Sequence, residues 1–171
     1  VNASGTGPLT YQWKFNNNNT GTNSNTLNLS NVSAGNVGYY KVLVSNSCGS
    51  VLSDSVLLNV NTSTSITSQP TALNVCSGTN TGFSVSASGT NLSYQWKKNG
   101  FNIGTNSNAL NINYASFVDT GKYFVVVTGT CGTVFSDTVT LAIKTAPSIS
   151  SQPSAQNACA GGSASFSVNA A

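Results

Sequence analysis

The sequence predicts an all-β protein made of tandem β-sandwich units with a period of 83 residues. Three observations lead to this prediction. Motifs return at one fixed offset, apolar and polar residues alternate over short runs, and turn residues separate these runs at regular spacing. No stretch shows the spacing of an amphipathic helix. Short strands of this kind are typical of two sheets packed face to face.

The repeat is defined by motifs that recur 83 residues apart. Tyr11-Gln12-Trp13 returns as Tyr94-Gln95-Trp96, and Ser68-Gln69-Pro70 returns as Ser151-Gln152-Pro153. The offset predicts three segments: the later part of one unit at 1–60, a complete unit at 61–143, and the opening part of a third unit at 144–171. A period this strict indicates a tandem array in which neighbouring units have equivalent surroundings.

The complete unit contains about seven predicted strands, and apolar residues alternate in most of them. Pro70 interrupts the first, which places that strand at a sheet edge because proline has no amide hydrogen to donate. Asn99-Gly100 predicts a tight hairpin, since both turn positions need positive φ. The predicted strands cover 66–70, 71–75, 81–87, 92–98, 109–113, 122–128 and 134–143.

Composition excludes most chemistry. Charged residues make up 5% of the chain, all of them Lys or Asp, and there is no His, Glu, Arg or Met. General acid–base catalysis and zinc binding both depend on residue types that are missing, so we expect no enzyme activity and no catalytic, cofactor-binding or metal-binding residues. A net charge of +3 from dispersed Lys argues against nucleic-acid binding. No apolar run is long enough to span a membrane.

The motifs of the complete unit resemble the immunoglobulin superfamily. Tyr94-Gln95-Trp96 is similar to the strand that carries the core tryptophan, and Asp119-Thr120-Gly121-Lys122-Tyr123 is similar to the tyrosine corner. In the first unit, Asn36 stands where the corner has its acid. Val85 and Val125 occupy the positions of the antibody cystine, so packing alone would hold the sheets together. The resemblance implies tandem immunoglobulin-like β-sandwiches with Trp13, Tyr40, Trp96 and Tyr123 in their cores.

Shorter motifs resemble the immunoglobulin-like repeats of very large surface and gliding adhesins of Bacteroidota. They are the Val-Cys-Ser-Gly opening at 75–78, Cys131-Gly132, and Gln69-Pro70. This resemblance implies an extracellular, cell-surface protein whose partners are neighbouring units of the same array, with surface glycans or other cells as further candidates. Asp54-Ser55-Val56 and Asp137-Thr138-Val139 look like the O-glycosylation acceptor of these bacteria, which would modify Ser55 and Thr138. Alternatively, each triplet is only the start of the final strand.

The cysteines occupy repeated positions and suggest an oxidising, extracellular setting. The strand layout predicts that Cys76 and Cys131 lie at opposite ends of the complete unit, too far apart for a disulfide. We therefore expect a bond across each junction, from the Cys76-type residue of one unit to the Cys131-type residue of the next. A bond within the unit and free thiols are the alternatives. The candidate residues are Cys48, Cys76, Cys131 and Cys159.

Three functions compete. The first is a structural and adhesive repeat, in which short junctions at 61–65 and 144–147 make the array semi-rigid. The second is a carbohydrate- or protein-binding module of a secreted enzyme. The third is a self-assembling fibre, in which residues 144–171 complete residues 1–60 of another molecule by strand addition. Aromatic residues near predicted turns either stack on sugars or plug the ends of the sandwich. They are Phe15, Phe101, Tyr114 and Phe117.

Overall fold

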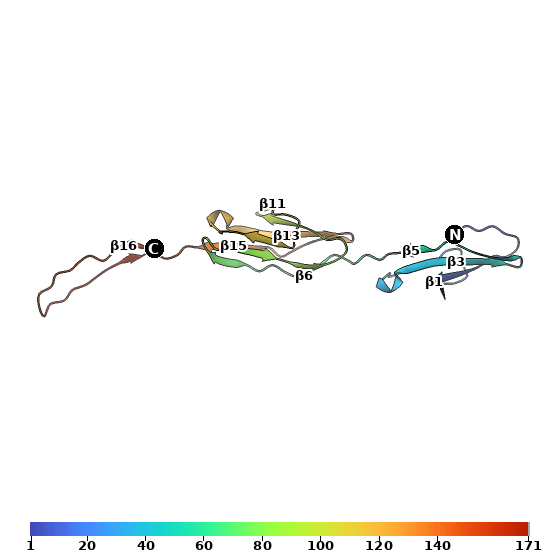
Figure 1. Cartoon of the computed structure of the whole chain (residues 1–171), viewed down its shortest axis with the longest axis horizontal. Coiled ribbons are helices and arrows are strands. Elements are labelled where there is room, and N and C mark those ends of the chain that lie inside the picture. The colour runs from blue at the N-terminus through green and yellow to red at the C-terminus, as the bar shows by residue number, and fades with distance from the viewer. Residues whose placement is uncertain (171) are drawn as a thin grey trace. The chain divides into compact units, whose positions relative to one another are not determined.

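The computed structural model describes residues 1–170 of the chain. The chain divides into two compact units, Val1–Asn61 and the residues from Thr62 onward. Ala171, the last residue of the predicted third segment, lies outside the described residues. Apart from two 3-10 turns, every regular element is a β-strand (Figure 1). The all-β fold expected from the alternating sequence pattern is confirmed.

In the second unit, the larger sheet has six strands, five of them in the order β11 (Phe101–Ile103), β10 (Ser93–Lys98), β13 (Gly121–Gly129), β15 (Val139–Lys144) and β7 (Leu73–Cys76). β14 (Gly132–Phe135) also pairs with β13. All neighbours in this sheet are antiparallel except β15 and β7, which run parallel. Along the chain, β7 is the first strand of this sheet and β15 is the last, and their pairing joins the beginning of the sheet to its end.

Two short strand pairs form the opposite layer. β8 (Thr81–Ser84) pairs with β12 (Ala109–Ile112), and β6 (Ser65–Ser68) pairs with β9 (Ser86–Ser88). The predicted strand at 81–87 changes partner at Val85. The Val85 amide still donates to the Asn108 carbonyl (2.9 Å), one step beyond the Ser84–Ala109 pair, and β9 then pairs with β6.

Pro70 marks the point where the opening segment changes sheets. β6 lies before it and pairs in the smaller layer, while β7 lies after it and pairs with β15 in the larger sheet. The ring of Pro70 is buried. Because proline cannot donate to a ladder, it suits a residue that passes between two sheets.

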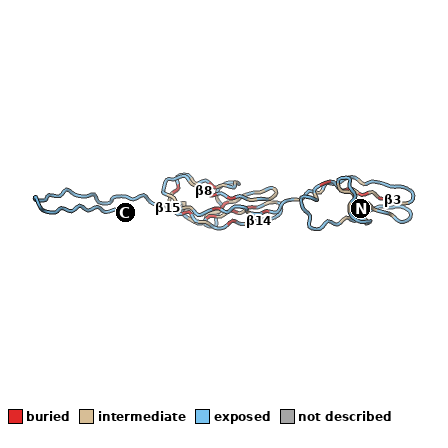
Figure 2. The backbone as a smooth tube through the Cα atoms, turned by 90° about the horizontal axis from the view of Figure 1, so that it is seen from below, coloured by how far each residue is buried: buried red, intermediate tan, exposed pale blue. Residues whose placement is uncertain are grey.

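The core of the second unit lies between these layers. Trp96 is fully buried and Tyr123 is 2% exposed. The ring of Phe83, which comes from β8, lies 4.8 Å from the ring of Tyr123 and 6.1 Å from that of Trp96. Packing between layers therefore replaces the cystine of antibody domains, as the valines at its two positions imply. In Figure 2 the buried residues of this unit, drawn in red, are distributed along its strands. The other core residues are Val85, Leu110, Val125, Val127 and Leu141.

The first unit repeats part of this framework. Its strands are β1 (Thr10–Phe15), β2 (Asn18–Thr20), β3 (Gly38–Asn46), β4 (Gly49–Leu52) and β5 (Val56–Leu58), in the order β2-β1-β3-β4 with β5 also on β3. Trp13 stands opposite Val42, just as Trp96 stands opposite Val125. The sequence repeat is thus a repeat of strand order and register.

β12 of the second unit has a matching segment in the first unit that does not form a strand. Residues 26–29 match β12 in sequence position, yet they form no strand. In the second unit β12 is paired with β8, and residues 1–61 contain no counterpart of β8. A strand without a partner does not form its ladder, so this difference follows from pairing and not from local sequence.

Residues 145–170 carry the opening motifs of a third unit. Within them, β16 (Ile149–Ser151) pairs with β17 (Asn169–Ala170). Every described residue of this segment is exposed, including the apolar side chains of Ile149, Phe166 and Val168.

The 3-10 turns η1 (Ala34–Asn36) and η2 (Phe117–Asp119) form the tyrosine corners. The Tyr123 hydroxyl donates to the Asp119 carbonyl at 2.5 Å, and the Tyr40 hydroxyl donates to the Asn36 carbonyl at 3.0 Å. The side chain of Asp119 accepts from the Ser116 amide (2.9 Å). In the first unit, the Asn36 side-chain oxygen accepts from the Ser33 amide at 2.8 Å, so an amide replaces the carboxylate in the same geometry.

The buried corner predicts a loss of stability in alkali. Burial, with a smaller contribution from the Asp119 carboxylate, raises the pKa of Tyr123 from 10.0 to about 12. A raised folded-state pKa stabilises the fold below pH 10, and this stabilisation disappears as the pH rises to about 12. We expect the free energy of unfolding of the second unit to fall by roughly 2 kcal/mol over that window. Urea unfolding followed by Trp96 fluorescence measures the fall. Tyr123→Phe should flatten it, and an equally steep fall in that variant would contradict the assignment.

Candidate functional surfaces

The four cysteines are exposed and unpaired. Cys76 ends β7 opposite Lys144, at the end of the unit where β15 finishes. Cys131 lies in the turn between β13 and β14, and the neighbouring Thr130 amide donates to Thr90 at the other end. The length of β13 separates the two ends, roughly 25 Å at strand rise, whereas a disulfide needs Cα atoms within about 7 Å. This geometry excludes a bond between Cys76 and Cys131 in the folded unit.

In the remaining segments, Cys48 lies in the turn between β3 and β4, which matches the place of Cys131. Cys159 precedes a turn in the exposed third segment. The junction-spanning bond stays a prediction, because its partner residues would belong to units other than those described.

Exposure of the cysteines predicts ready alkylation. We expect all four thiols of the reduced chain to react with iodoacetamide under native conditions, at rates close to those in urea, because none is shielded. Intact-mass spectrometry over time counts the modified thiols. A thiol that reacts only after unfolding would show that its turn is covered.

The two glycosylation candidates lie at an interruption of the last strand. The amide of Val125 donates to the Ser136 hydroxyl (2.9 Å), and the Ser136 amide donates back to the Val125 carbonyl (2.9 Å). The serine side chain thus replaces one ladder partner, and residues 136–138 leave the strand between β14 and β15. Thr138 is exposed there. Sequence reasoning missed this role of serine, although the recurrence of serine at 53 and 136 was a signal.

The first unit has the same interruption. The Val42 amide donates to the Ser53 hydroxyl at 2.9 Å, and Ser55 is exposed. Ser55 also borders a shallow cavity with Asn16, Asn17, Tyr39 and Lys41. Both hydroxyls are therefore accessible to a modifying enzyme without unfolding of a strand.

The aromatic residues singled out in the sequence differ in how far they are buried. Trp96, Tyr123 and Tyr40 are buried, whereas Trp13 is half-buried and donates its indole N–H to the Ser24 carbonyl (2.9 Å). Phe15 stacks on Tyr40 with ring centroids 4.9 Å apart. The other three loop aromatics do not plug the sandwich but face solvent: Phe101, Tyr114 and Phe117.

Within residues 1–170, no three residues of the metal-binding types His, Cys, Asp and Glu gather at one place. The described part of the chain also contains no helix that is long and apolar enough to cross a membrane.

Comparison of the sequence with protein-family models and with curated proteins gives no match. Solved structures do resemble the chain. Extracellular domains 3–5 of Drosophila OTK give a TM-score of 0.57 at 20% identity, covering 80% of this chain and 52% of that one. The N-terminal four Ig domains of Dscam1 isoform 9.44 give 0.54 at 20% identity, covering 80% and 37%. Those of isoform 7.44 give 0.53 at 22% identity, covering 80% and 38%.

These similarities establish the fold as tandem immunoglobulin-like β-sandwiches. The chain spans about half the length of the OTK structure and less than two fifths of either Dscam1 structure. At this identity the likeness concerns architecture, and function has to be argued from the surfaces of this chain.

Proposed function

We propose that the chain is a non-catalytic structural and adhesive segment of a long extracellular cell-surface protein, similar to the repeats of large Bacteroidota adhesins. The observation that carries the proposal is the parallel pairing of β15 and β7, from Leu141 opposite Leu73 to Lys144 opposite Cys76. Force applied to the chain at the two ends of this unit reaches the start of β7, after β6 and its pairing with β9, and the end of β15. The ladder is then loaded along its length, so several hydrogen bonds must break together.

The ladder continues one step beyond the strands, because the Ser77 amide donates to the Lys144 carbonyl at 3.0 Å. Single-molecule stretching of the chain tests the load-bearing role. We expect one unfolding event for the second unit, with a gain in contour length of roughly 28 nm for about 80 residues. Ser77→Pro removes the donor and should lower the unfolding force, whereas Ser77→Ala keeps the amide and should leave it unchanged. Equal forces in both variants, or extension without a force peak, would refute the role.

The proposed location has its own test. Antibodies against the chain should label intact cells of the source organism, and mild protease treatment should remove the label. Labelling that requires permeabilised cells would contradict a surface location. Peptides that carry Ser55 or Thr138, isolated from those cells, should show a glycan mass if the exposed strand interruption is modified. If the peptides carry no glycan, the glycosylation proposal fails, and each triplet is only the start of the final strand.

The proposal includes disulfides across junctions, supported by the placement of cysteines at opposite ends of the unit. Oxidised protein isolated from the source should yield a crosslinked peptide that joins a Cys76-type residue to a Cys131-type residue of the following unit. Recovery of these peptides as free thiols from an oxidising compartment would exclude the bond.

A second candidate is association by strand addition. It is favoured by the unpaired residues 26–29 of the first unit and by exposed Ile149, Phe166 and Val168 in the third segment. Ser165 stands where the second unit has Gly82, and a Cβ built at Gly82 would lie 2.4 Å from the Leu110 carbonyl oxygen. Light scattering should therefore show head-to-tail oligomers of the chain. Ser165→Gly removes a Cβ from the added strand and should lower the concentration at which the oligomers form. A monomer at all concentrations, in both forms, would exclude this candidate.

A further inference from the structure

The second unit carries an exposed apolar surface that the first unit lacks. Four large side chains make up this surface, which we call the aromatic surface: Phe101 (78% exposed), Tyr114 (76%), Phe117 (59%) and Val118 (81%). The first unit has small or polar residues at the equivalent positions, 83 residues earlier: Asn18, Asn31, Ala34 and Gly35. The framework is shared by both units, so folding does not require these side chains.

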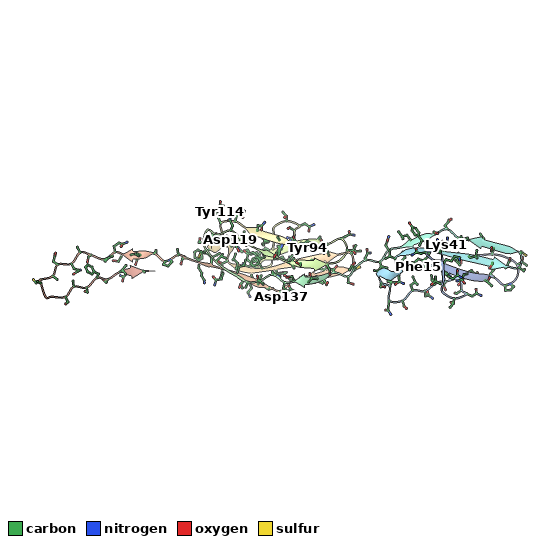
Figure 3. All side chains as sticks on the ribbon, turned by 60° about the horizontal axis from the view of Figure 1, so that its bottom comes forward. Phe15, Lys41, Tyr94, Tyr114, Asp119 and Asp137 are labelled. Carbon is green, nitrogen blue, oxygen red and sulfur yellow. The ribbon has the colours of Figure 1, made fainter. Side chains whose placement is uncertain are left out.

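Strand register and the corner bring the four residues to one end of the unit. Phe101 stands opposite Lys98 at the β10–β11 turn, and the Lys98 ammonium donates to the carbonyl of Val118 in η2. Phe117 and Val118 are consecutive residues of η2, and Tyr114 precedes η2 in the loop that leads from β12. Figure 1 shows η2 and β11 on the same side of the unit, and Figure 3 shows Tyr114 at the edge of the unit near Asp119.

The backbone at Tyr114 is unfavourable for its side chain. Tyr114 has a φ of +52°, in the left-handed region that bulky residues avoid and asparagine tolerates. The equivalent Asn31 has the same φ of +52°. The second unit thus has an exposed tyrosine at a position that suits asparagine. Burial does not explain it, and neither does local conformation, which leaves a contact outside the chain as its reason.

The chemistry of the surface indicates a neutral ligand. Two charged groups of this surface are engaged within the unit: the Lys98 ammonium donates to the Val118 carbonyl, and the Asp119 carboxylate accepts from the amide and the hydroxyl of Ser116. The exposed polar residues next to Tyr114 and η2 in the chain are neutral donors and acceptors: Asn113 and Thr120. Aromatic faces attract the C–H groups of a sugar ring, while amides and hydroxyls bind its hydroxyls.

The area of the surface favours a small ligand over a second protein. The exposed parts of the four side chains amount to on the order of 500 Å², whereas a stable protein interface needs about 800 Å² from each partner. We propose that the aromatic surface of the second unit binds a neutral oligosaccharide of a few sugar residues. This inference rests on the adhesive part of the proposed function and gives it a site and a ligand class.

Neutral hexose oligosaccharides of different linkage test the inference, namely maltohexaose, cellohexaose, laminarihexaose and xylohexaose, with a sulfated heparin fragment as the charged probe. We expect the 171-residue chain to bind at least one neutral probe in calorimetry or NMR titration, and not the heparin fragment. The variant Phe101→Asn, Tyr114→Asn, Phe117→Ala, Val118→Gly restores the first unit's residues and should weaken binding at least about tenfold. Its melting temperature should be unchanged or higher, because the left-handed backbone then holds asparagine.

Phe135→Ala is the matched control, since Phe135 is 65% exposed on β14 and lies outside the aromatic surface. It should bind like the unmodified chain. Binding of none of the neutral probes, equal loss in the control, or preference for the heparin fragment would overturn the inference. The inference would also be overturned if the chain self-associates and the four substitutions abolish this association, because the surface would then bind a second copy of the chain. None of these outcomes alters the response to force, so the two proposals fail separately.

Discussion

Replacing Trp96 by alanine should lower the free energy of unfolding of the second unit by about 4 kcal/mol. Trp96 is the largest fully buried side chain, and neighbours from both layers surround it. Truncation loses its apolar contacts, leaves a cavity that strands on both sides keep open, and orphans the Ser107 carbonyl that accepts its indole N–H (3.0 Å). Urea unfolding followed by circular dichroism measures the loss.

Trp13→Ala provides the matched comparison within the same chain. Trp13 has the same strand position and the same kind of bond, to Ser24, but it is only half-buried. Less apolar area is lost, so we expect a decrease of about 1–2 kcal/mol in the first unit. Each variant retains one tryptophan, whose fluorescence reports the unit that was not changed. Equal losses for the two substitutions would contradict the difference in packing between the units.

Gly82→Ala should cost about 3 kcal/mol, the second largest effect we expect. Gly82 faces Asn111 across the β8–β12 pair, and a Cβ there would lie 2.4 Å from the Leu110 carbonyl oxygen and 3.2 Å from the Asn111 Cα. These are backbone atoms, so relief requires the two strands to separate and Phe83 to move within the core.

Gly35→Ala is the control for the glycine itself. The nearest atom to a Cβ at Gly35 is the Ser33 hydroxyl at 3.7 Å, so the change should be nearly neutral. Thermal unfolding of both variants separates the steric effect from the general effect of replacing glycine. A Gly82→Ala variant as stable as the Gly35→Ala variant would show that β8 and β12 are not held this close.

Local sequence was sufficient to predict the features that depend on neighbours in the chain. Alternation located β10 and β13, and Asn99-Gly100 forms the predicted turn with φ values of 50° and 91°. The single strand predicted at 134–143 is instead divided into β14 and β15. Pro70 was expected at an edge, and it lies where the segment passes from one layer to the other. Each of these features is set by side-chain period or by backbone chemistry at one or two residues.

Features that depend on distant partners were not predicted. Residues 26–29 and 109–112 have nearly the same pattern, but only the second forms a strand, because β8 pairs with it. The 3-10 turns span three residues each, which is too short for a helical period to appear. For the candidate surfaces, the sequence identified the aromatic residues, but their exposure and the strained backbone at Tyr114 became evident only in three dimensions.

The central claim is that residues 62–144 form a closed immunoglobulin-like module in which β7 and β15, the first and last strands of its larger sheet, are paired. Native-state hydrogen exchange, resolved by residue, tests it most directly. We predict that amides in β7 and β12 that pair with β15 and β8 exchange as slowly as those of β10 and β13, through opening of the whole unit. Amides of residues 26–29 should exchange much faster. If amides of β7 or β12 exchanged as fast as those of residues 26–29, these strands would not be stably paired. The module could then neither bear load through the β7–β15 ladder nor hold the aromatic surface in a fixed arrangement.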